Sequence, residues 1–205
     1  MRLARASSPR TALSPLDARE AQRAWLVKEA QIFEHDNKTP SKADRFRSRS
    51  LGVVEPLMQA GDVETTTRAI VALGKAVDAA SEEEAALLCA AIRDCGAIQR
   101  LVNLLDHSEA LIHRMATMLI ANAAALEVDP HGASRSKRMI LEAGGFTKVV
   151  GKIFTATEST TIMYALGAVQ NLCCADLRCV ETLQRTGADV RLLELSRSPD
   201  ERIAR

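Results

Sequence analysis

A glycine followed at once by an apolar helical pattern occurs three times in this sequence, and this repetition favours a repeat architecture. The three segments are GAIQRLVNLL from Gly96, GGFTKVVGKIF from Gly144 and GADVRLLEL from Gly187. With the second segment matched at Gly145, the glycines lie 49 and 42 residues apart. A short helical pattern precedes each glycine, and a longer one follows the first two segments. Each unit is therefore predicted to contain three helices.

Asparagine supplies a second landmark for the same register. Asn122 lies 26 residues after Gly96, and Asn171 lies 26 residues after Gly145. The two landmarks are independent of each other, and both indicate the same repeat.

An earlier and less similar unit begins at Gly52 with GVVEPLMQAGDVETTTRAIVALGKAV, and it places Lys75 where the asparagines fall. Helix formers dominate from Leu51 onward, and the alternation of β-branched residues that is typical of strands is absent. The sequence therefore predicts an all-α fold of stacked units. In the Gly96 unit, apolar residues at helical spacing are expected to form the buried stripe of the second helix: Ile98, Leu101, Val102 and Leu105.

Residues 85–125 resemble an armadillo repeat, because a short helix ends in Gly-Ala-Ile, a Leu-Val-x-Leu-Leu helix follows, and a long helix carries Leu and Asn. The resemblance extends less closely over about residues 51–205. It implies a right-handed α-solenoid, that is, an armadillo-like superhelix of three-helix repeats. The units would cover about 51–80, 81–126, 134–175 and 176–205, the last one incomplete. HEAT-type repeats, which stack helices over a similar period, are the structural alternative.

The glycine turns have a physical basis, because two helices that meet at a sharp angle need a residue that accepts positive φ and a close backbone approach. A bulkier residue at Gly96 is therefore expected to clash.

The loops SEEEAAL from Ser81 and DPHGASRSK from Asp129 are expected to face solvent. Ser198-Pro199-Asp200 predicts an N-cap and the start of a further helix. An uncapped last unit would expose an apolar face, so we expect the chain to be a fragment of a longer protein or to be covered there by another subunit or by altered packing.

Charge divides the chain into two parts. Residues 1–50 hold 11 Lys or Arg against 6 Asp or Glu, whereas residues 51–205 hold 16 against 20. The first part, which also contains prolines and serines, is predicted to be a basic, partly disordered segment with one helix near 17–34, in which Trp25 covers one end of the core or docks on a partner. The second part is predicted to be the repeat domain. The net charge of the whole chain is +1, and the repeat region is acidic, so nucleic-acid binding is not expected.

No apolar run in the sequence is long enough to span a membrane or to act as a secretory signal. The sequence therefore favours a cytoplasmic location, with a nuclear location and mitochondrial targeting as the alternatives.

The residues that carry enzyme chemistry are also missing, since there is no G-x-S-x-G, no H-E-x-x-H and no phosphate-binding glycine loop. We expect no catalytic residue, no cofactor and no metal. The cysteines form no C-x-x-C pair and have no histidine at zinc-ligand spacing: Cys89, Cys95, Cys173, Cys174 and Cys179.

In armadillo proteins the long third helices line a concave groove, and this is where the resemblance implies a function. Where members of the family bind extended peptides, an Asn on each such helix hydrogen-bonds the peptide backbone, which nominates Asn122 and Asn171. An amide offers both a donor and an acceptor, so it can hold a peptide unit whatever its side chain. Helical spacing along the same faces adds the remaining groove candidates: Arg68, Lys75, Met115, Met118 and Tyr164.

These residues predict a non-enzymatic scaffold that binds a protein or peptide partner in the groove. The Trp that the nuclear-import branch carries one turn before each Asn is replaced by Met118 and Gly167, so a segment with apolar anchors is favoured over a strongly charged one. Two structural alternatives stay open: the asparagines could cap or bridge neighbouring helices, and the methionines could pack between repeats. Two functional alternatives also stay open, a structural or assembly subunit that uses the solenoid ends and a regulatory fragment of a larger multidomain protein. The oligomeric state is not predicted.

Overall fold

The structure, a computed structural model, describes residues 41–174 and 177–204. The helix predicted near 17–34, with Trp25, lies outside these residues. The described chain forms eleven helices and no strand, which confirms the all-α prediction. The helices are α2 (Lys42–Gln59), α3 (Val63–Asp78), α4 (Glu82–Asp94), α5 (Ala97–Leu104), α6 (Ala110–Ala123), α7 (Ala133–Glu142), α8 (Gly145–Thr155), α9 (Ser159–Cys173), α10 (Leu177–Thr186), α11 (Ala188–Leu195) and α12 (Glu201–Ala204).

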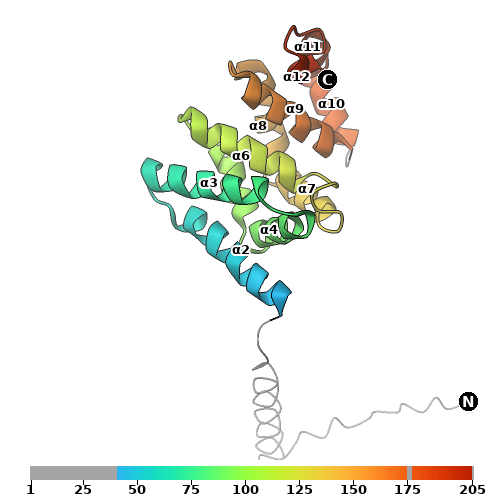
Figure 1. Cartoon of the computed structure of the whole chain (residues 1–205). Helices are drawn as coiled ribbons and strands as arrows, with labels where there is room; N and C mark the ends of the chain where they lie inside the picture. The colour runs from blue at the N-terminus through green and yellow to red at the C-terminus, as the bar shows by residue number, and fades with distance from the viewer. Residues whose placement is uncertain (1–40, 175–176, 205) are drawn as a thin grey trace, which may run out of the picture. The chain divides into compact units, whose positions relative to one another are not determined.

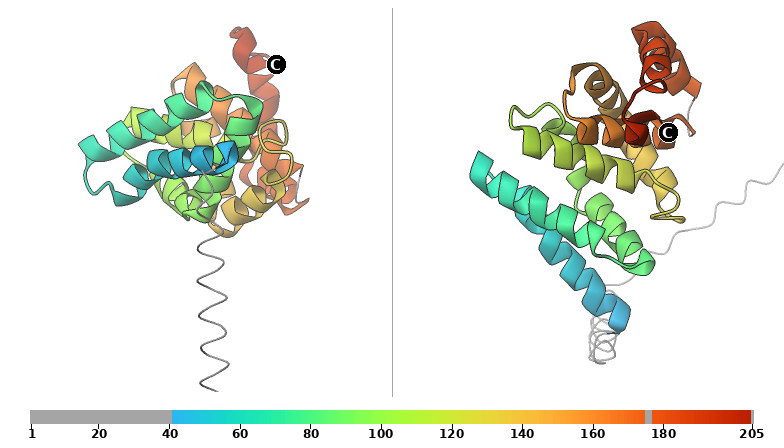
Figure 2. Two further views of the ribbon diagram at one scale, coloured as in Figure 1. Left: turned by 60° about the horizontal axis from the view of Figure 1, so that its bottom comes forward. Right: turned by 45° about the horizontal axis from the view of Figure 1, so that its top comes forward.

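The helices repeat in groups of three. The groups are α4 to α6, α7 to α9 and α10 to α12, and the pair α2 and α3 precedes them. The third helices α3, α6 and α9 lie side by side in chain order (Figure 1), and α12 contacts α9. The right-hand view of Figure 2 shows the same succession from another direction. Residues 44–204 therefore form an all-α solenoid, as predicted.

The apolar stripe predicted on the second helix of the Gly96 unit forms the core. Its four side chains on and after α5 are each no more than 1% exposed. Helix α6 supplies the opposing wall with Ile112, Ala116 and Leu119, all fully buried. Burying one Leu or Ile side chain contributes roughly 1.5–3 kcal/mol relative to leaving it in water. One connected core runs from Val54 on α2 to Ile203 on α12.

The glycine register differs by one residue from the predicted one. The residues with positive φ are Gly96 (71°), Gly144 (74°) and Gly187 (74°), so the second unit is matched at Gly144 and not at Gly145. Gly145 instead takes the buried position that Ala97 and Ala188 take in their units. A Cβ at Gly145 would lie 2.9 Å from Val102 Cγ2 and 2.8 Å from Ile140 Cγ2. The sequence pattern cannot distinguish Gly144 from Gly145, because only their backbone φ angles differ.

Gly96 also requires a correction, because the expected clash is absent. A Cβ built on Gly96 meets nothing within 4 Å. The turn needs glycine because of the left-handed backbone conformation, which costs other L-residues energy even where space is free.

Helix α2 begins before the boundary predicted between residues 50 and 51. Ser50, Val54 and Leu57 lie on one face of α2 and are each at most 1% exposed. The Ser50 hydroxyl donates to the Phe46 carbonyl at 2.9 Å, so this polar side chain is satisfied within the helix. The basic residues of this segment lie in the same helix and are exposed: Lys42, Arg45, Arg47 and Arg49.

The segment DPHGASRSK is only partly solvent-facing, which corrects the expectation for it. Helix α7 begins inside it at Ala133, and Ser136 and Lys137 are buried. Asp129 is also buried, at 3% exposed, because it forms an ion pair with Arg93 of α4. At the other predicted loop, Ser81 is the N-cap of α4 and forms a reciprocal pair of hydrogen bonds with Glu84.

The buried Arg93 and Asp129 are the centre of a polar cluster that fastens α4 to the α6–α7 loop. Arg93 Nη1 also donates to Ser136 Oγ at 3.0 Å, and the Gly132 amide donates to Asp129 Oδ1 at 2.8 Å. A Cβ at Gly132 would lie 2.1 Å from Arg93 Nη2, so the loop backbone lies directly over the guanidinium. This cluster gives the inserted loop a fixed place against the repeat.

The last described helix starts where the sequence predicted a helix start, but Asp200 serves as its cap in place of Ser198. The Asp200 carboxylate accepts from the Arg202 amide at 3.1 Å, and its carbonyl accepts from the amides of Ile203 and Ala204. Ser198 Oγ accepts from the Asp200 amide at 3.2 Å, which holds the preceding turn.

Candidate functional site

Six of the seven predicted groove residues keep at least part of their surface in solvent, and they lie on α3, α6 and α9. We call this side of the three helices the third-helix surface. It is defined by Arg68 and Lys75 on α3, Met115 and Asn122 on α6, and Tyr164 and Asn171 on α9.

Asn171 bridges two neighbouring units. Its Nδ2 donates to the carbonyl of Ala121 on α6 at 3.2 Å. Asn171 therefore bridges two neighbouring helices, which is one of the alternatives that the sequence left open. Its Oδ1 has no hydrogen-bond donor among the residues that the structure describes and remains able to accept one.

Asn122 has the same place on α6 but a different environment. It is half-exposed, and its side-chain amide makes no hydrogen bond to any described residue. The residue of α3 that corresponds to Ala121 is Gly74, and its carbonyl receives no bond from Asn122. Asn122 therefore presents one acceptor and two donor hydrogens to solvent.

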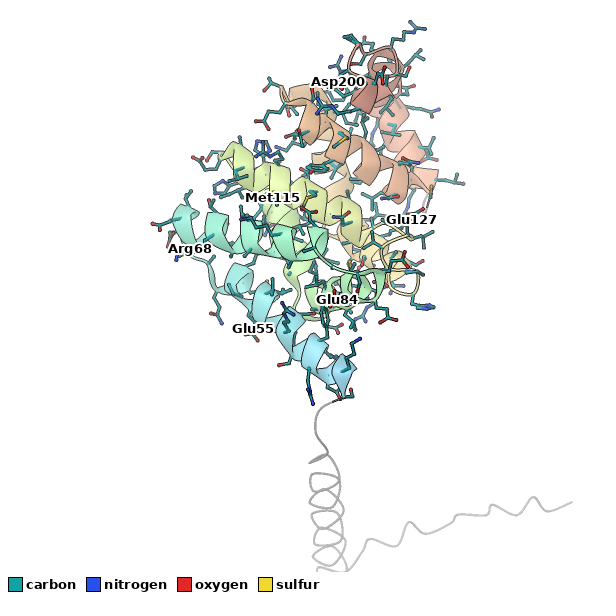
Figure 3. The ribbon with its side chains drawn as sticks, in the orientation of Figure 1. Glu55, Arg68, Glu84, Met115, Glu127 and Asp200 are labelled. Atoms are coloured by element: carbon teal, nitrogen blue, oxygen red, sulfur yellow. The ribbon has the colours of Figure 1, made fainter. Side chains whose placement is uncertain are left out.

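Met118, the seventh predicted groove residue, is a core residue. It is 4% exposed. A Cβ at Gly74 would lie 3.1 Å from the Met118 methyl carbon and 2.1 Å from that of Met115, so both methionines pack over this glycine of α3. Met115 keeps part of its surface exposed, and Figure 3 shows it beside α3. The predicted groove role of Met118 is wrong, because the small Gly74 leaves room that its side chain fills.

The third-helix surface carries little unpaired charge. Arg68, at the outer end of α3 in Figure 3, pairs with Glu64 at 2.6 Å. Arg114 on α6 pairs at 2.8 Å with Glu158, which precedes α9. Lys75 is exposed and has no ion pair among the described residues. Tyr164 is half-buried and packs against the core.

Solved structures can be compared with this arrangement. A computationally designed armadillo repeat protein for modular peptide recognition is 25% identical, with a TM-score of 0.58, over 75% of this chain and 59% of that one. A designed armadillo repeat protein in complex with the peptide (KR)4 is 23% identical, with a TM-score of 0.59, over 93% of this chain and 73% of that one. This chain has an armadillo-like repeat fold.

An engineered protein is also similar, with 24% identity and a TM-score of 0.58 over 76% of this chain and 58% of that one. This chain thus spans less than two thirds of that protein and of the peptide-recognition design. No protein-family model matches the chain, and a comparison with curated proteins gives no match either.

The ion pair between Arg114 and Glu158 joins two armadillo-like units and was not predicted from the sequence. The two residues lie 44 positions apart, and neither belongs to a recognisable motif. Only the stacking of α9 against α6 brings Glu158 to Arg114, so no sequence signal for this pair exists beyond the repeat itself.

The cysteines are free thiols with different environments. Burial, together with the negative charge of Asp129, raises the pKa of Cys89 to about 11. Burial also raises the pKa of Cys173, which hydrogen-bonds the buried Cys179. Among residues 41–174 and 177–204, no group of three or more His, Cys, Asp or Glu is placed to hold a metal ion. No helix in this part of the chain is both long and apolar enough to cross a membrane.

Proposed function

We propose that this chain is a non-enzymatic scaffold that binds an extended segment of a partner protein across the third-helix surface. The observation that carries this proposal is the half-exposed, unbonded amide of Asn122 at the middle of that surface. Such an amide can donate to a peptide carbonyl and accept from a peptide N–H at the same time. Two structural neighbours, one designed for modular peptide recognition and one in complex with a peptide, support the proposal.

The side chains around Asn122 favour a segment with apolar anchors. Glu64 on α3 and Glu158 just before α9 already pair with arginines, so a strongly basic peptide gains few new ion pairs from them. Met115 and Tyr164 each present a partly exposed apolar surface. An extended segment would place alternate side chains on these residues and its backbone on Asn122.

The test uses the full chain and a displayed library of random linear peptides. Selected peptides are synthesised, and their affinities are measured by fluorescence polarisation for the wild type, Asn122→Ala, and the control Asn103→Ala. Asn103 is an exposed residue of α5 that bonds only within its own helix. We expect Asn122→Ala to weaken binding by about 1–3 kcal/mol, and Asn103→Ala to leave it unchanged. Equal affinities for the wild type and Asn122→Ala would contradict the proposal.

One observation favours a second candidate function, assembly through an end of the solenoid. Leu177, Val190 and Leu193 on α10 and α11 are 82%, 60% and 56% exposed. Leu193 corresponds to Val102 and Val150, which are 0% and 2% exposed. A partner bound through this surface would be lost on Leu193→Asp and retained on Asn122→Ala, whereas a partner bound at the third-helix surface would show the reverse.

A further inference from the structure

A small polar cavity lies among α6, α8 and the start of α9, and none of the six residues that define the third-helix surface lines it. Its volume is about 160 Å³. Its polar lining consists of His113 from α6, Lys152 and Thr155 from α8, and Thr157, Glu158 and Thr161 from the α8–α9 loop and α9. Of these side chains, the function proposed above uses only Glu158, as a carboxylate that Arg114 already neutralises.

The basic residue Lys152 occupies a position that is apolar in the neighbouring units. It lies eight residues after the positive-φ glycine of its unit, as do Leu104 and Leu195. Those leucines are 5% and 7% exposed, so this position ordinarily belongs to the core. A lysine there forfeits apolar burial and places an ammonium group in a half-buried site.

His113 shows the same kind of replacement. It lies nine residues before Asn122, just as Ile162 lies nine residues before Asn171. Ile162 is 7% exposed. The Nδ1 atom of His113 is buried and has no hydrogen-bond partner among the described residues. Lys152 and His113 therefore each replace an apolar residue of a neighbouring unit with a side chain that carries nitrogen. Both side chains line the same cavity.

The charges around the cavity leave one cation without a counter-ion. Glu158 is engaged by Arg114 at 2.8 Å, and Asp106 is engaged by Lys148 at 2.8 Å. Lys152 makes no ion pair with any residue that the structure describes. Burial lowers the pKa of Lys152 and outweighs the opposing effect of the Asp106 charge. Burial together with the charge of Lys152 lowers the pKa of His113 and outweighs the opposing effect of Glu158. Both shifts are those of cationic groups whose charged forms are poorly stabilised.

We propose that this cavity binds a small oxyanion, a carboxylate, sulfate or phosphate group, through the Lys152 ammonium, the His113 imidazole and the Thr157 hydroxyl. An anion supplies the missing counter-charge for Lys152 and an acceptor for a protonated His113. The volume accommodates a group of this size, whereas drug-sized ligands occupy about 300–1,000 Å³. The oxyanion is either a free inorganic ion or the acidic side chain of a partner.

The test measures sulfate binding to the full chain by isothermal titration calorimetry at constant ionic strength, with chloride as the replacement. The variant Lys152→Leu restores the residue that the corresponding positions carry, so we expect it to fold. We expect saturable sulfate binding by the wild type and a dissociation constant about tenfold or more higher for Lys152→Leu. The control Lys75→Met removes an exposed lysine of α3 that does not line the cavity, and it should bind sulfate as the wild type does.

Proton NMR of the imidazoles gives a second readout. Lys152, Glu158, Arg114 and His107 are the charged or titratable groups that act on His113. An anion bound among them stabilises the imidazolium, so the pKa of His113 should rise in sulfate, while the resonances of the exposed His131 should not respond to sulfate binding. No saturable binding, or equal binding by Lys152→Leu, would overturn the proposal.

Further arms identify the source of the oxyanion. Binding of phosphate and sulfate without binding of an N-acetyl aspartate amide would indicate a free ion, whereas tighter binding of the aspartate amide than of either inorganic ion would indicate a partner's side chain. The probes are small molecules, so these results do not depend on whether a peptide binds at Asn122.

Discussion

Gly96 and Gly52 both have free space around the Cα atom, but only the position of Gly96 requires glycine. A Cβ at either position meets nothing within 4 Å. Gly96 has φ of 71°, whereas Gly52 is not among the positive-φ residues and lies exposed inside α2. We expect Gly96→Ala to destabilise the fold by about 1–2 kcal/mol through backbone strain, and Gly52→Ala to stabilise it by up to about 1 kcal/mol through helix propensity. Urea unfolding of the two variants checks this, and a stable Gly96→Ala would show that the turn does not need a left-handed residue.

Thiol reactivity reports the environments of the cysteines. Burial and Asp129 raise the pKa of Cys89 to about 11, so this thiol stays protonated at pH 8, whereas Cys174 is exposed. We expect iodoacetamide at pH 8 to modify Cys174 first and Cys89 last, because the thiolate is the reacting form. Peptide mass spectrometry over time gives the order, and the unfolded chain should show no such difference. Rapid modification of native Cys89 would contradict its burial.

At the scale of the elements, the buried pair of Arg93 and Asp129 fastens α4 to the α6–α7 loop. Their side chains are 8% and 4% exposed. Asp129→Leu leaves the guanidinium buried without its counter-ion, so we expect a loss of about 3–5 kcal/mol, and the double variant with Arg93→Met should recover much of it. The exposed pair of Arg68 and Glu64 is the control, since Arg68→Met should cost under about 1 kcal/mol. Urea unfolding measures all three, and a mild effect of Asp129→Leu alone would contradict the role of the pair.

The sequence predicted the helices and their stacking because both depend on local patterns. The stripe from Ile98 to Leu105 follows helical spacing, and the glycines mark the sharp turns between helices. The choice between Gly144 and Gly145 could not be made, because the pattern is the same for both and only φ distinguishes them. The burial of Asp129 could not be predicted either, because its ion-pair partner Arg93 lies 36 residues away in the sequence.

The helix positions of the two asparagines could be predicted from the sequence, but the surroundings of their side chains could not. Spacing placed Asn122 and Asn171 on corresponding turns of α6 and α9, and the structure has them there. Whether an amide meets a carbonyl of the neighbouring helix depends on how closely two helices approach, which spacing does not specify. Met118 is buried for a related reason, because the hollow that it fills is made by Gly74 on a different unit.

At the scale of the whole molecule, stability should vary along the stack. Each unit of a solenoid contacts only its neighbours, so units with neighbours on both sides gain two interfaces. The contrast is visible in burial: α6 has eight buried residues, whereas α10 and α11 have two each. We expect amide hydrogen exchange to be slowest in α5, α6 and α8 and fastest in α10, α11 and α12. Exchange followed by mass spectrometry on the full chain resolves these helices.

The same measurement separates local from global opening. Leu193→Asp changes an exposed residue of α11 and should leave protection in α6 unchanged, whereas Ile112→Ala creates a cavity in the central unit and should accelerate exchange throughout the stack. If all helices of the wild type exchanged at one rate, the described region would unfold as a single unit, and the nearest-neighbour account of this solenoid would be wrong. A gradient that Ile112→Ala flattens and Leu193→Asp does not would show that the central unit holds the stack together.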